Sequence, residues 1–395
     1  MIPNTNYQNL KESYLFFHIA QKTAAYLQEH PDQRLLRMGI GDVSRPLAPV
    51  VVDALRAAAE DQGRPETFHG YMPECGAPFF REAVGAHYRG RGVAVGDDEV
   101  FVSSGASDEL GDILDLFQRG QTSAIMEPAY PAYVDANLMA GNRIVTVEAR
   151  QEDGFLPSPD GSLNADLLYV CSPNNPTGAA FSAEGLKAWV DWANAHDAVI
   201  LFDAAYEAFI EDPAVPHSIF EIDGARTCAI EICSLSKTAG FTGTRCGYTV
   251  IPKELTRGGM NLREMWIRNR TTKTNGVSYI LQKGAAAVFT PEGQLQIQDN
   301  LRVYKQNARL LMRALDETGT WYTGGVNAPY IWMHCPEGMD SWSFFDLLLN
   351  RCQVVGTPGE GFGACAKNYF RFSTFSSPED TAEAADRLKK LLKEM

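Results

Sequence analysis

One lysine in this sequence stands among residues that suit covalent chemistry. Lys237 lies in the segment SLSKTAGFTGTRCGY, with serines just before it and Arg245 eight positions after it. A lysine that condenses with an aldehyde cofactor needs an amine held in a tight turn, with hydroxyl groups and a guanidinium nearby to bind a phosphate. The segment therefore predicts that pyridoxal 5'-phosphate is the cofactor and that Lys237 attaches it.

Two further polar side chains come directly after strand-like runs. Asn175 follows DLLYVC, Asp203 ends AVILFD, and Lys237 follows CAIEIC. Taken singly, these residues are equally well explained as a turn asparagine, a helix cap and a surface lysine. In an open α/β sheet, however, ligands bind at the carboxyl ends of the strands. The shared position of the three therefore favours one site.

The residue types suggest how the cofactor ring is held. A buried Asp203 would keep a pyridine nitrogen protonated, so that the ring can accept electrons. Tyr206 would lie one helical turn away if a helix begins at Asp203, and with the amide of Asn175 it would hydrogen-bond the phenolic oxygen. Tyr130, in EPAYPAY, is able to stack on the ring face, and it is equally well explained as a turn aromatic.

Two segments supply the expected phosphate ligands. One is the lysine segment itself, and the other is the turn SGAS at 104–107, which follows the strand-like EVFVS and opens a predicted helix. Hydroxyl groups, a guanidinium and the backbone amides of a helix N-terminus all bind phosphate. The predicted ligands are Ser234, Ser236, Arg245, Ala106 and Ser107.

Composition limits the other classes of function. The chain has 395 residues, of which 45% are hydrophobic, and a formal net charge of −14. This charge disfavours nucleic acid and anionic membranes as partners. The eight cysteines form no CxxC pair, so we expect free thiols and no metal site. Without a signal-like N-terminus or a membrane span, the sequence predicts a cytoplasmic protein.

Short apolar runs alternate with helical segments between residues 102 and 251. Several of the runs are continuously hydrophobic, as strands covered on both faces require, so we expect an open, mainly parallel α/β sheet. The runs are SAIM, NRIVTV, DLLYVC, AVILFD, CAIEIC and GYTVI.

The remaining segments divide the chain into three parts. Residues 1–45 should form an irregular arm that lies on a partner subunit, a helix from Ser13 to about His30, and part of a small domain. Residues 46–290 should form the large cofactor-binding domain. Residues 291–395 should form a long connecting helix and a C-terminal small α+β domain. GTPGEGFG, at 356–363, lacks the spacing of a dinucleotide-binding motif, and we expect a flexible loop there.

With its candidate site residues in this order and spacing, the chain resembles the class I/II pyridoxal-phosphate aminotransferases. The similarity covers nearly the whole length and is most specific in SPNNPTG, FDAAYEAF and SLSKTAGFTGTRCGY. It implies the α/β architecture of fold type I, with a mainly parallel central sheet in the large domain and a smaller α+β domain. It also implies a homodimer with shared active sites.

Within that group, further segments are similar to those of the LL-diaminopimelate aminotransferases. They include LLRMGIGDVSRPL, HGYMPECG, EPAYPAYVD, TTKTNG and NYFRFS. This similarity implies transfer of an amino group between LL-2,6-diaminopimelate and 2-oxoglutarate, giving tetrahydrodipicolinate and L-glutamate, in the biosynthesis of lysine and peptidoglycan. The catalytic residues would be Lys237, Asp203 and Tyr206.

The same similarity implies a substrate site. Arg371 would bind the substrate α-carboxylate, as its planar guanidinium suits. Tyr14 and the backbone at Gly41 would help to hold the substrate, and Tyr130 and Asn175 would contact it. The residues that would reach into the neighbouring subunit's site are Tyr71, Glu74 and Asn275. Tyr71 would also contact the cofactor there, and the Glu74 carboxylate would bind a distal ammonium of the substrate.

Two positions depart from the family pattern, and other functions stay open. Ser107 stands where lysine is common, and Cys75 where glutamine is common. The same cofactor would also serve an aminotransferase of other amino-acid specificity or a C–S β-lyase. A non-catalytic regulator that binds the cofactor is a third function, which the acidic composition disfavours.

Overall fold

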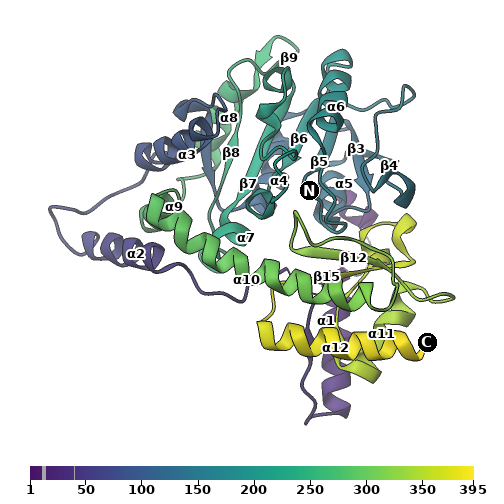
Figure 1. Cartoon of the computed structure of the whole chain (residues 1–395). Coiled ribbons are helices and arrows are strands. Elements are labelled where there is room, and N and C mark those ends of the chain that lie inside the picture. Colours follow the sequence, from purple (N-terminus) through teal and green to yellow (C-terminus); the bar gives the residue numbers. More distant parts are fainter. Residues whose placement is uncertain (11–14, 40) are drawn as a thin grey trace.

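A seven-stranded sheet forms the centre of the larger part of the molecule (Figure 1). The computed structural model describes residues 1–10, 15–39 and 41–395. All neighbouring strands of the sheet pair in parallel except β8, which is antiparallel to both of its neighbours. In spatial order the strands are β2 (Val100–Ser103), β8 (Gly247–Val250), β7 (Ala229–Ser234), β6 (Val199–Asp203), β5 (Leu167–Cys171), β3 (Thr122–Glu127) and β4 (Arg143–Glu148).

The strand-like run GYTVI forms the one antiparallel strand of the described sheet, which is mainly parallel as the sequence predicts. In the register of β7 and β8, Ser234 lies opposite Gly247. The chain therefore leaves the sheet after Ser234 and returns at the same end of the sheet at Gly247, thirteen residues later. This reversal brings Lys237 and Arg245 to one side of the sheet, which a parallel crossover would not do.

Helices pack against the sheet in one hydrophobic core. Every residue of β5, β6 and β7 is buried, as their continuous apolar sequences predict. Leu186 and Trp189 of one helix and Leu110 of another belong to the same core. The helices of this part are α2 (Pro49–Asp61), α3 (Pro78–Gly90), α4 (Ala106–Asp112), α5 (Pro131–Ala140), α6 (Ala183–Ala195), α7 (Leu235–Ala239), α8 (Leu262–Lys273) and α9 (Tyr279–Val288).

A second core joins the N-terminal helix to the C-terminal third of the chain. Ile19 and Leu36 near the N-terminus pack with Trp332, Phe345 and Phe370. Strand β1 (Leu36–Arg37) pairs in parallel with β13 (Val354–Val355). The other elements are α1 (Leu15–Glu29), α11 (Ser341–Cys352), α12 (Pro378–Glu394) and an antiparallel sheet in the order β11 (Tyr322–Gly324), β12 (Tyr330–His334), β15 (Tyr369–Ser373) and β14 (Thr357–Pro358).

One long helix, α10 (Pro291–Asp316), connects the two cores. It begins as the sequence predicts, because the Thr290 side chain accepts a hydrogen bond from the backbone of Gly293. Leu301 packs into the first core and Leu311 into the second. The helix therefore ties the two cores together along one rigid element.

The expectation of an irregular N-terminal segment was wrong. Thr5–Asn9 forms a 3₁₀ helix instead of an irregular segment, because the Asn4 side chain accepts the backbone N–H of Asn6. The side chains of Asn4 and Asn6 also donate to the carbonyl oxygen of Met139 in α5 of the same chain.

The segment at 356–363 is not an open loop. It contains β14 and a 3₁₀ helix, Gly359–Phe362. A Cβ at Gly359 would lie 2.2 Å from the carbonyl oxygen of Ala366, so this glycine permits close packing of two backbone segments. Ser13, the expected cap of the first helix, lies outside the described residues.

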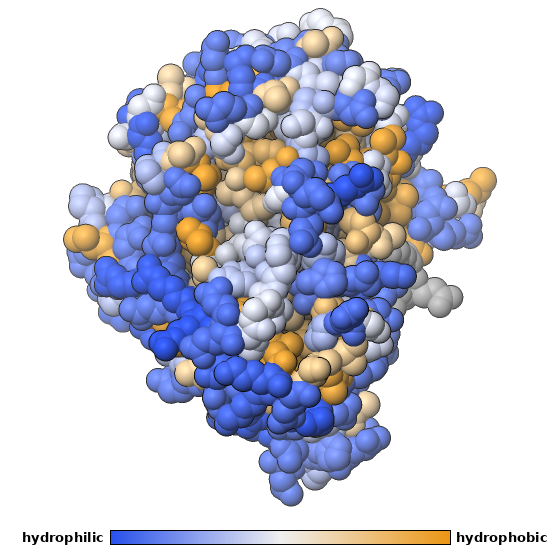
Figure 2. All heavy atoms as spheres, turned by 45° about the vertical axis from the view of Figure 1, so that its right-hand side comes forward, coloured by the Kyte–Doolittle hydropathy of each residue, from blue (hydrophilic) through white to orange (hydrophobic). Residues whose placement is uncertain are grey.

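The surface agrees with the acidic, polar composition. The face in Figure 2 is mostly hydrophilic, with apolar residues in small scattered groups, as is usual for globular proteins. Among the described residues, no helix is both long and apolar enough to cross a membrane.

Candidate active site

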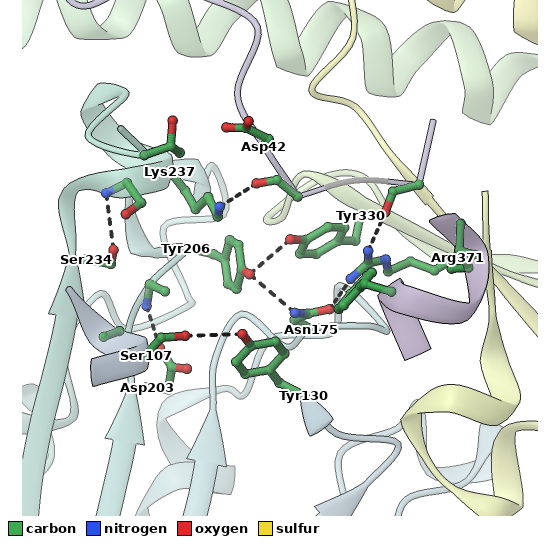
Figure 3. Close-up of a pocket in the computed structure, with 18 of the residues that line it drawn as sticks. Asp42, Ser107, Tyr130, Asn175, Asp203, Tyr206, Ser234, Lys237, Tyr330 and Arg371 are labelled. Atoms are coloured by element: carbon green, nitrogen blue, oxygen red, sulfur yellow. Dashed lines mark hydrogen bonds between the residues drawn. The ribbon is translucent and has the colours of Figure 1, made fainter. Parts of the chain in front are cut away.

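A cavity of about 480 Å³ lies at the carboxyl ends of the parallel strands and is lined by residues of both cores (Figure 3). The structure gathers most of the sequence-predicted site residues in this one cavity, although they come from seven separate segments of the chain. Those that line it are Gly41, Ala106, Ser107, Tyr130, Asn175, Asp203, Tyr206, Ser234, Ser236, Lys237, Arg245 and Arg371.

Lys237 lies in the short helix α7, which starts the return from β7 to β8. The Ser234 side chain caps this helix by accepting the backbone N–H of Ser236. The Lys237 ammonium donates to the carbonyl oxygen of Gly41. Burial lowers the pKa of Lys237 to about 8, and the nearby Asp42 carboxylate opposes this shift. Since an amine is nucleophilic only without its proton, the lowered pKa suits covalent attachment of an aldehyde.

Asp203 is held at the end of β6 by two donors. Its Oδ2 accepts from the hydroxyl of Tyr133 at 2.6 Å, and its Oδ1 accepts from the backbone N–H of Ala205 at 3.0 Å. Burial raises the pKa of Asp203, while the Tyr133 hydrogen bond opposes that rise. The sequence analysis missed Tyr133. Its position three residues after Tyr130 in EPAYPAY was the available signal, because that spacing brings two aromatic rings to one end of a helix.

Tyr206 reaches the site by a different local structure from the one expected. No helix begins at Asp203; a turn leads to the 3₁₀ helix Glu207–Phe209. The Tyr206 hydroxyl nevertheless lies 3.4 Å from Nδ2 of Asn175 and 3.0 Å from the hydroxyl of Tyr330. Tyr330, at the start of β12, is a buried site residue that the sequence gave no means of finding, because it lies 124 positions further along the chain.

Residues of the types that bind phosphate lie together at one end of the cavity. Nη1 of Arg245 donates to the Ser236 hydroxyl at 3.0 Å. The same guanidinium lies against the turn that opens α4: a Cβ at Gly105, where φ is +124°, would be 2.4 Å from Nη2 of Arg245. The Ser107 hydroxyl lies 3.2 Å from that of Tyr130. Only a glycine allows the turn and the guanidinium to approach so closely.

This arrangement fits pyridoxal 5'-phosphate. The hydroxyls of Ser234 and Ser236, Arg245 and the turn before α4 converge as phosphate ligands do. Asp203 and Lys237 line the same cavity, so one ligand is able to meet a carboxylate at one ring position and an amine at another. The donor set and the backbone cradle at Gly105 are therefore complementary to the cofactor that the sequence predicts.

Arg371 lies at the other side of the cavity and is only 1% exposed. Its Nη1 donates to Oδ1 of Asn175 and its Nη2 to the carbonyl oxygen of Gly39, both at 2.6 Å. Its guanidinium stacks on the ring of Tyr330 at 4.4 Å. These contacts fix the plane of the guanidinium, which then suits a carboxylate ligand with the same planar geometry.

Three predicted residues do not line this cavity. Tyr71 is 85% exposed, and Glu74 and Asn275 are also absent from the cavity wall. The segments of Glu74 and Asn275 lie side by side, since a Cβ at Gly276 would be 3.4 Å from the Cα of Glu74. Tyr14 lies outside the described residues.

Comparisons with known proteins show the family of the chain. The family model described as "Aminotransferase class I and II" matches residues 33–388. The LL-diaminopimelate aminotransferase of Agathobacter rectalis is 46% identical over 98% of this chain and 99% of its own, and that of Lawsonia intracellularis is 47% identical over 98% of both. The solved structure of the L,L-diaminopimelate aminotransferase from Chlamydomonas reinhardtii has a TM-score of 0.93 and 37% identity, covering 99% of this chain and 98% of that one.

Proposed function

The chain belongs to the class I and II aminotransferases, and on that premise we propose that it transfers an amino group between LL-2,6-diaminopimelate and 2-oxoglutarate, giving tetrahydrodipicolinate and L-glutamate. The observation that carries the proposal is the single cavity in which Lys237, Asp203 and Arg371 meet. Its relatives of 46–47% identity support the choice of substrate. The reaction would serve the synthesis of lysine and peptidoglycan.

The residues present fit pyridoxal 5'-phosphate, which when bound supplies an electron sink for negative charge on the substrate α-carbon. Ser234, Ser236 and Arg245 would hold its phosphate together with the backbone at Ala106 and Ser107. The Asp203 carboxylate would hold a proton at the pyridine nitrogen. Tyr206 and Asn175 would hydrogen-bond the phenolic oxygen, and Tyr130 would cover the ring face.

The remaining chemistry is a proton transfer at a positioned carbon. Arg371 would bind the substrate α-carboxylate, with Asn175, Gly41 and Tyr14 completing the contacts. Lys237, whose pKa of about 8 lies near neutral pH, would then take the proton from the substrate α-carbon when the amino donor reacts. It would return a proton to the α-carbon when the 2-oxo acid reacts. The two substrates would react in turn at the same cavity, which gives ping-pong kinetics.

We also propose a homodimer with shared active sites. Tyr71, Glu74 and Asn275 lie off the wall of their own cavity, and Tyr71 is among the most exposed large side chains of the described chain. In a dimer these residues would contact the cofactor and the distal ammonium of the substrate in the neighbouring site. Residues 46–290 would be the large domain, and 1–45 with 291–395 the smaller one.

The proposed location is the cytoplasm. The eight cysteines form no disulfide with one another, as is usual in a reducing compartment. Small amino and 2-oxo acids would be the ligands, and we propose no nucleic-acid or membrane partner.

The test is product analysis with the purified enzyme and matched substrates. LL-diaminopimelate with 2-oxoglutarate should give glutamate, and Lys237→Ala should give none. L-cystathionine should release no pyruvate; its release would indicate the C–S β-lyase instead. Glutamate formed from other amino acids at higher kcat/KM than from LL-diaminopimelate would indicate an aminotransferase of different specificity.

A further inference from the structure

Arg37 lies on the wall of the same cavity, and none of the roles described above uses it. It is the second residue of β1, and its side chain is exposed. Within the described part of the chain, its guanidinium forms no hydrogen bond and no ion pair. An arginine that faces a cavity without forming an ion pair is available to an anionic ligand.

The direction of Arg37 follows from the alternation along this extended segment. Leu36 and Met38 are buried in the second core, so Arg37 and Gly39 face the opposite way. Gly39 lines the cavity, and its carbonyl oxygen accepts from Nη2 of Arg371 at 2.6 Å. Two residues of extended chain span at most about 7 Å. The Cα of Arg37 therefore lies within about 7 Å of the Cα of Gly39, the residue that anchors Arg371.

Charge in the cavity points to the same residue. Four cations line its described wall: Arg37, Lys237, Arg245 and Arg371. In the proposed function, Arg245 binds phosphate, Arg371 binds the α-carboxylate and Lys237 reacts. Ser107 is neutral and adds no charge. Of these four described cations, Arg37 is the one left for a second carboxylate, which both LL-diaminopimelate and glutamate carry.

The surface beside Arg37 suits a methylene chain. Val355 of β13 is the strand partner of Arg37 and lines the cavity, and Phe16, Ile19 and Ala20 of α1 contribute further apolar side chains to its wall. Apolar side chains cover methylene groups favourably. A chain of four to six carbon–carbon bonds spans roughly 5–8 Å. A second carboxylate at that distance from Arg371 lies within reach of the segment that carries Arg37, because Arg371 donates to the carbonyl oxygen of Gly39, two residues along the same segment.

We propose that Arg37 binds the second carboxylate of dicarboxylic substrates and so selects them over monocarboxylic amino acids of the same length. This proposal rests on the proposed function, because it takes Arg371 as the site of the α-carboxylate. Arg37 would be a determinant of specificity for both half-reactions, since the two amino donors share this second carboxylate.

The test compares matched substrates in single-turnover half-reactions. LL-diaminopimelate is paired with L-lysine, which lacks the second carboxylate, and glutamate with L-2-aminobutyrate. Arg37→Gln should lower the second-order rate constant about 10- to 100-fold for both dicarboxylates, the range expected for loss of a hydrogen bond to a charged group, and at most twofold for the monocarboxylates. Arg37→Lys should recover part of the loss.

Controls separate charge, folding and function. Arg119→Gln removes an exposed arginine that does not line the cavity and should leave all four rate constants unchanged. Inhibition by glutarate, compared with butyrate, gives the same contrast without turnover, and Arg37→Gln should weaken only glutarate. Equal losses for both members of each pair, or no loss for either, would overturn the role of Arg37.

The outcomes also distinguish this proposal from the proposed function. If the wild-type enzyme reacts with glutamate but not with LL-diaminopimelate, the proposed substrate fails, and the glutamate and glutarate comparisons still decide the role of Arg37. If LL-diaminopimelate reacts equally well with wild type and Arg37→Gln, the function stands and the role of Arg37 is refuted.

Discussion

Removal of the Tyr133 hydroxyl should lower the catalytic rate while the reacting lysine, Lys237, stays unchanged. The Tyr133 hydroxyl donates to Oδ2 of Asp203 at 2.6 Å, and Asp203 is otherwise held there by the backbone of Ala205. A hydrogen bond to a charged group contributes about 1.5–3 kcal/mol, which corresponds to roughly 10- to 150-fold in rate if the bond is needed in the transition state. Tyr133→Phe should therefore lower kcat by at least about tenfold.

The same substitution should also shift the pH dependence of kcat/KM in a defined direction. The Tyr133 hydrogen bond favours the charged carboxylate and so holds the pKa of Asp203 down against the rise caused by burial. Without that bond the pKa rises, so Asp203 gains its proton at higher pH, and the acid limb of kcat/KM should move to higher pH in Tyr133→Phe. The assay is kcat/KM from pH 5 to 9 with the cofactor saturating.

Tyr169→Phe is the matched control. Tyr169 is also buried and stacks on Tyr133 with ring centroids 5.1 Å apart, but its hydroxyl accepts from Asn137 and does not line the cavity. Its removal should cost similar stability and leave the acid limb in place. An acid limb of Tyr133→Phe that coincides with that of the wild type, with kcat within twofold, would refute the role given to this hydrogen bond.

Three further predictions concern the cofactor site. Lys237→Ala should abolish turnover and the absorbance band of lysine-bound cofactor, and substantial residual turnover would contradict the assignment. Uptake of pyridoxal 5'-phosphate by the cofactor-free protein, followed by that band, should accelerate with pH through a midpoint near 8, since burial lowers the pKa of Lys237 to about that value and the neutral amine is the reactive form; a midpoint near the ordinary lysine value of about 10.4 would argue against it. Gly105→Ala should weaken cofactor binding by tenfold or more in equilibrium titration, because the added Cβ would lie 2.4 Å from Nη2 of Arg245. The control is Gly111→Ala, within the helix α4 that Gly105 precedes; its added Cβ meets open space, so this variant should bind the cofactor normally. Equal affinities of the two variants would show that the close approach at Gly105 is not needed.

Much of the site was predictable because its residues lie at the carboxyl ends of apolar strands or shortly after them. Asn175, Asp203 and Lys237 each come after a hydrophobic run, and parallel neighbouring strands bring their carboxyl ends to one edge. The capped start of α10 at Thr290 was predictable for a similar local reason. Sequence reasoning succeeds where spacing along one element determines position.

The site residues that sequence reasoning missed are positioned by contacts between elements that are distant in the sequence. Tyr330 belongs to the four-stranded antiparallel sheet, and its contact with Tyr206 joins segments 124 positions apart, which no local pattern reports. Tyr206 was placed correctly for the wrong local reason, since a turn and not a helix follows Asp203. Arg37 was not singled out by type, because its position on the cavity wall, without an ion pair to any described residue, is set by the folded chain.

The most direct test of the central claim is the absorbance of the cofactor-loaded enzyme on addition of LL-diaminopimelate without a 2-oxo acid, with glutamate added in parallel. Both amino acids should convert the band of lysine-bound cofactor to that of its amine form, and 2-oxoglutarate should restore it. Conversion by glutamate but not by LL-diaminopimelate would contradict the proposed substrate, and conversion by neither would contradict aminotransfer at this site.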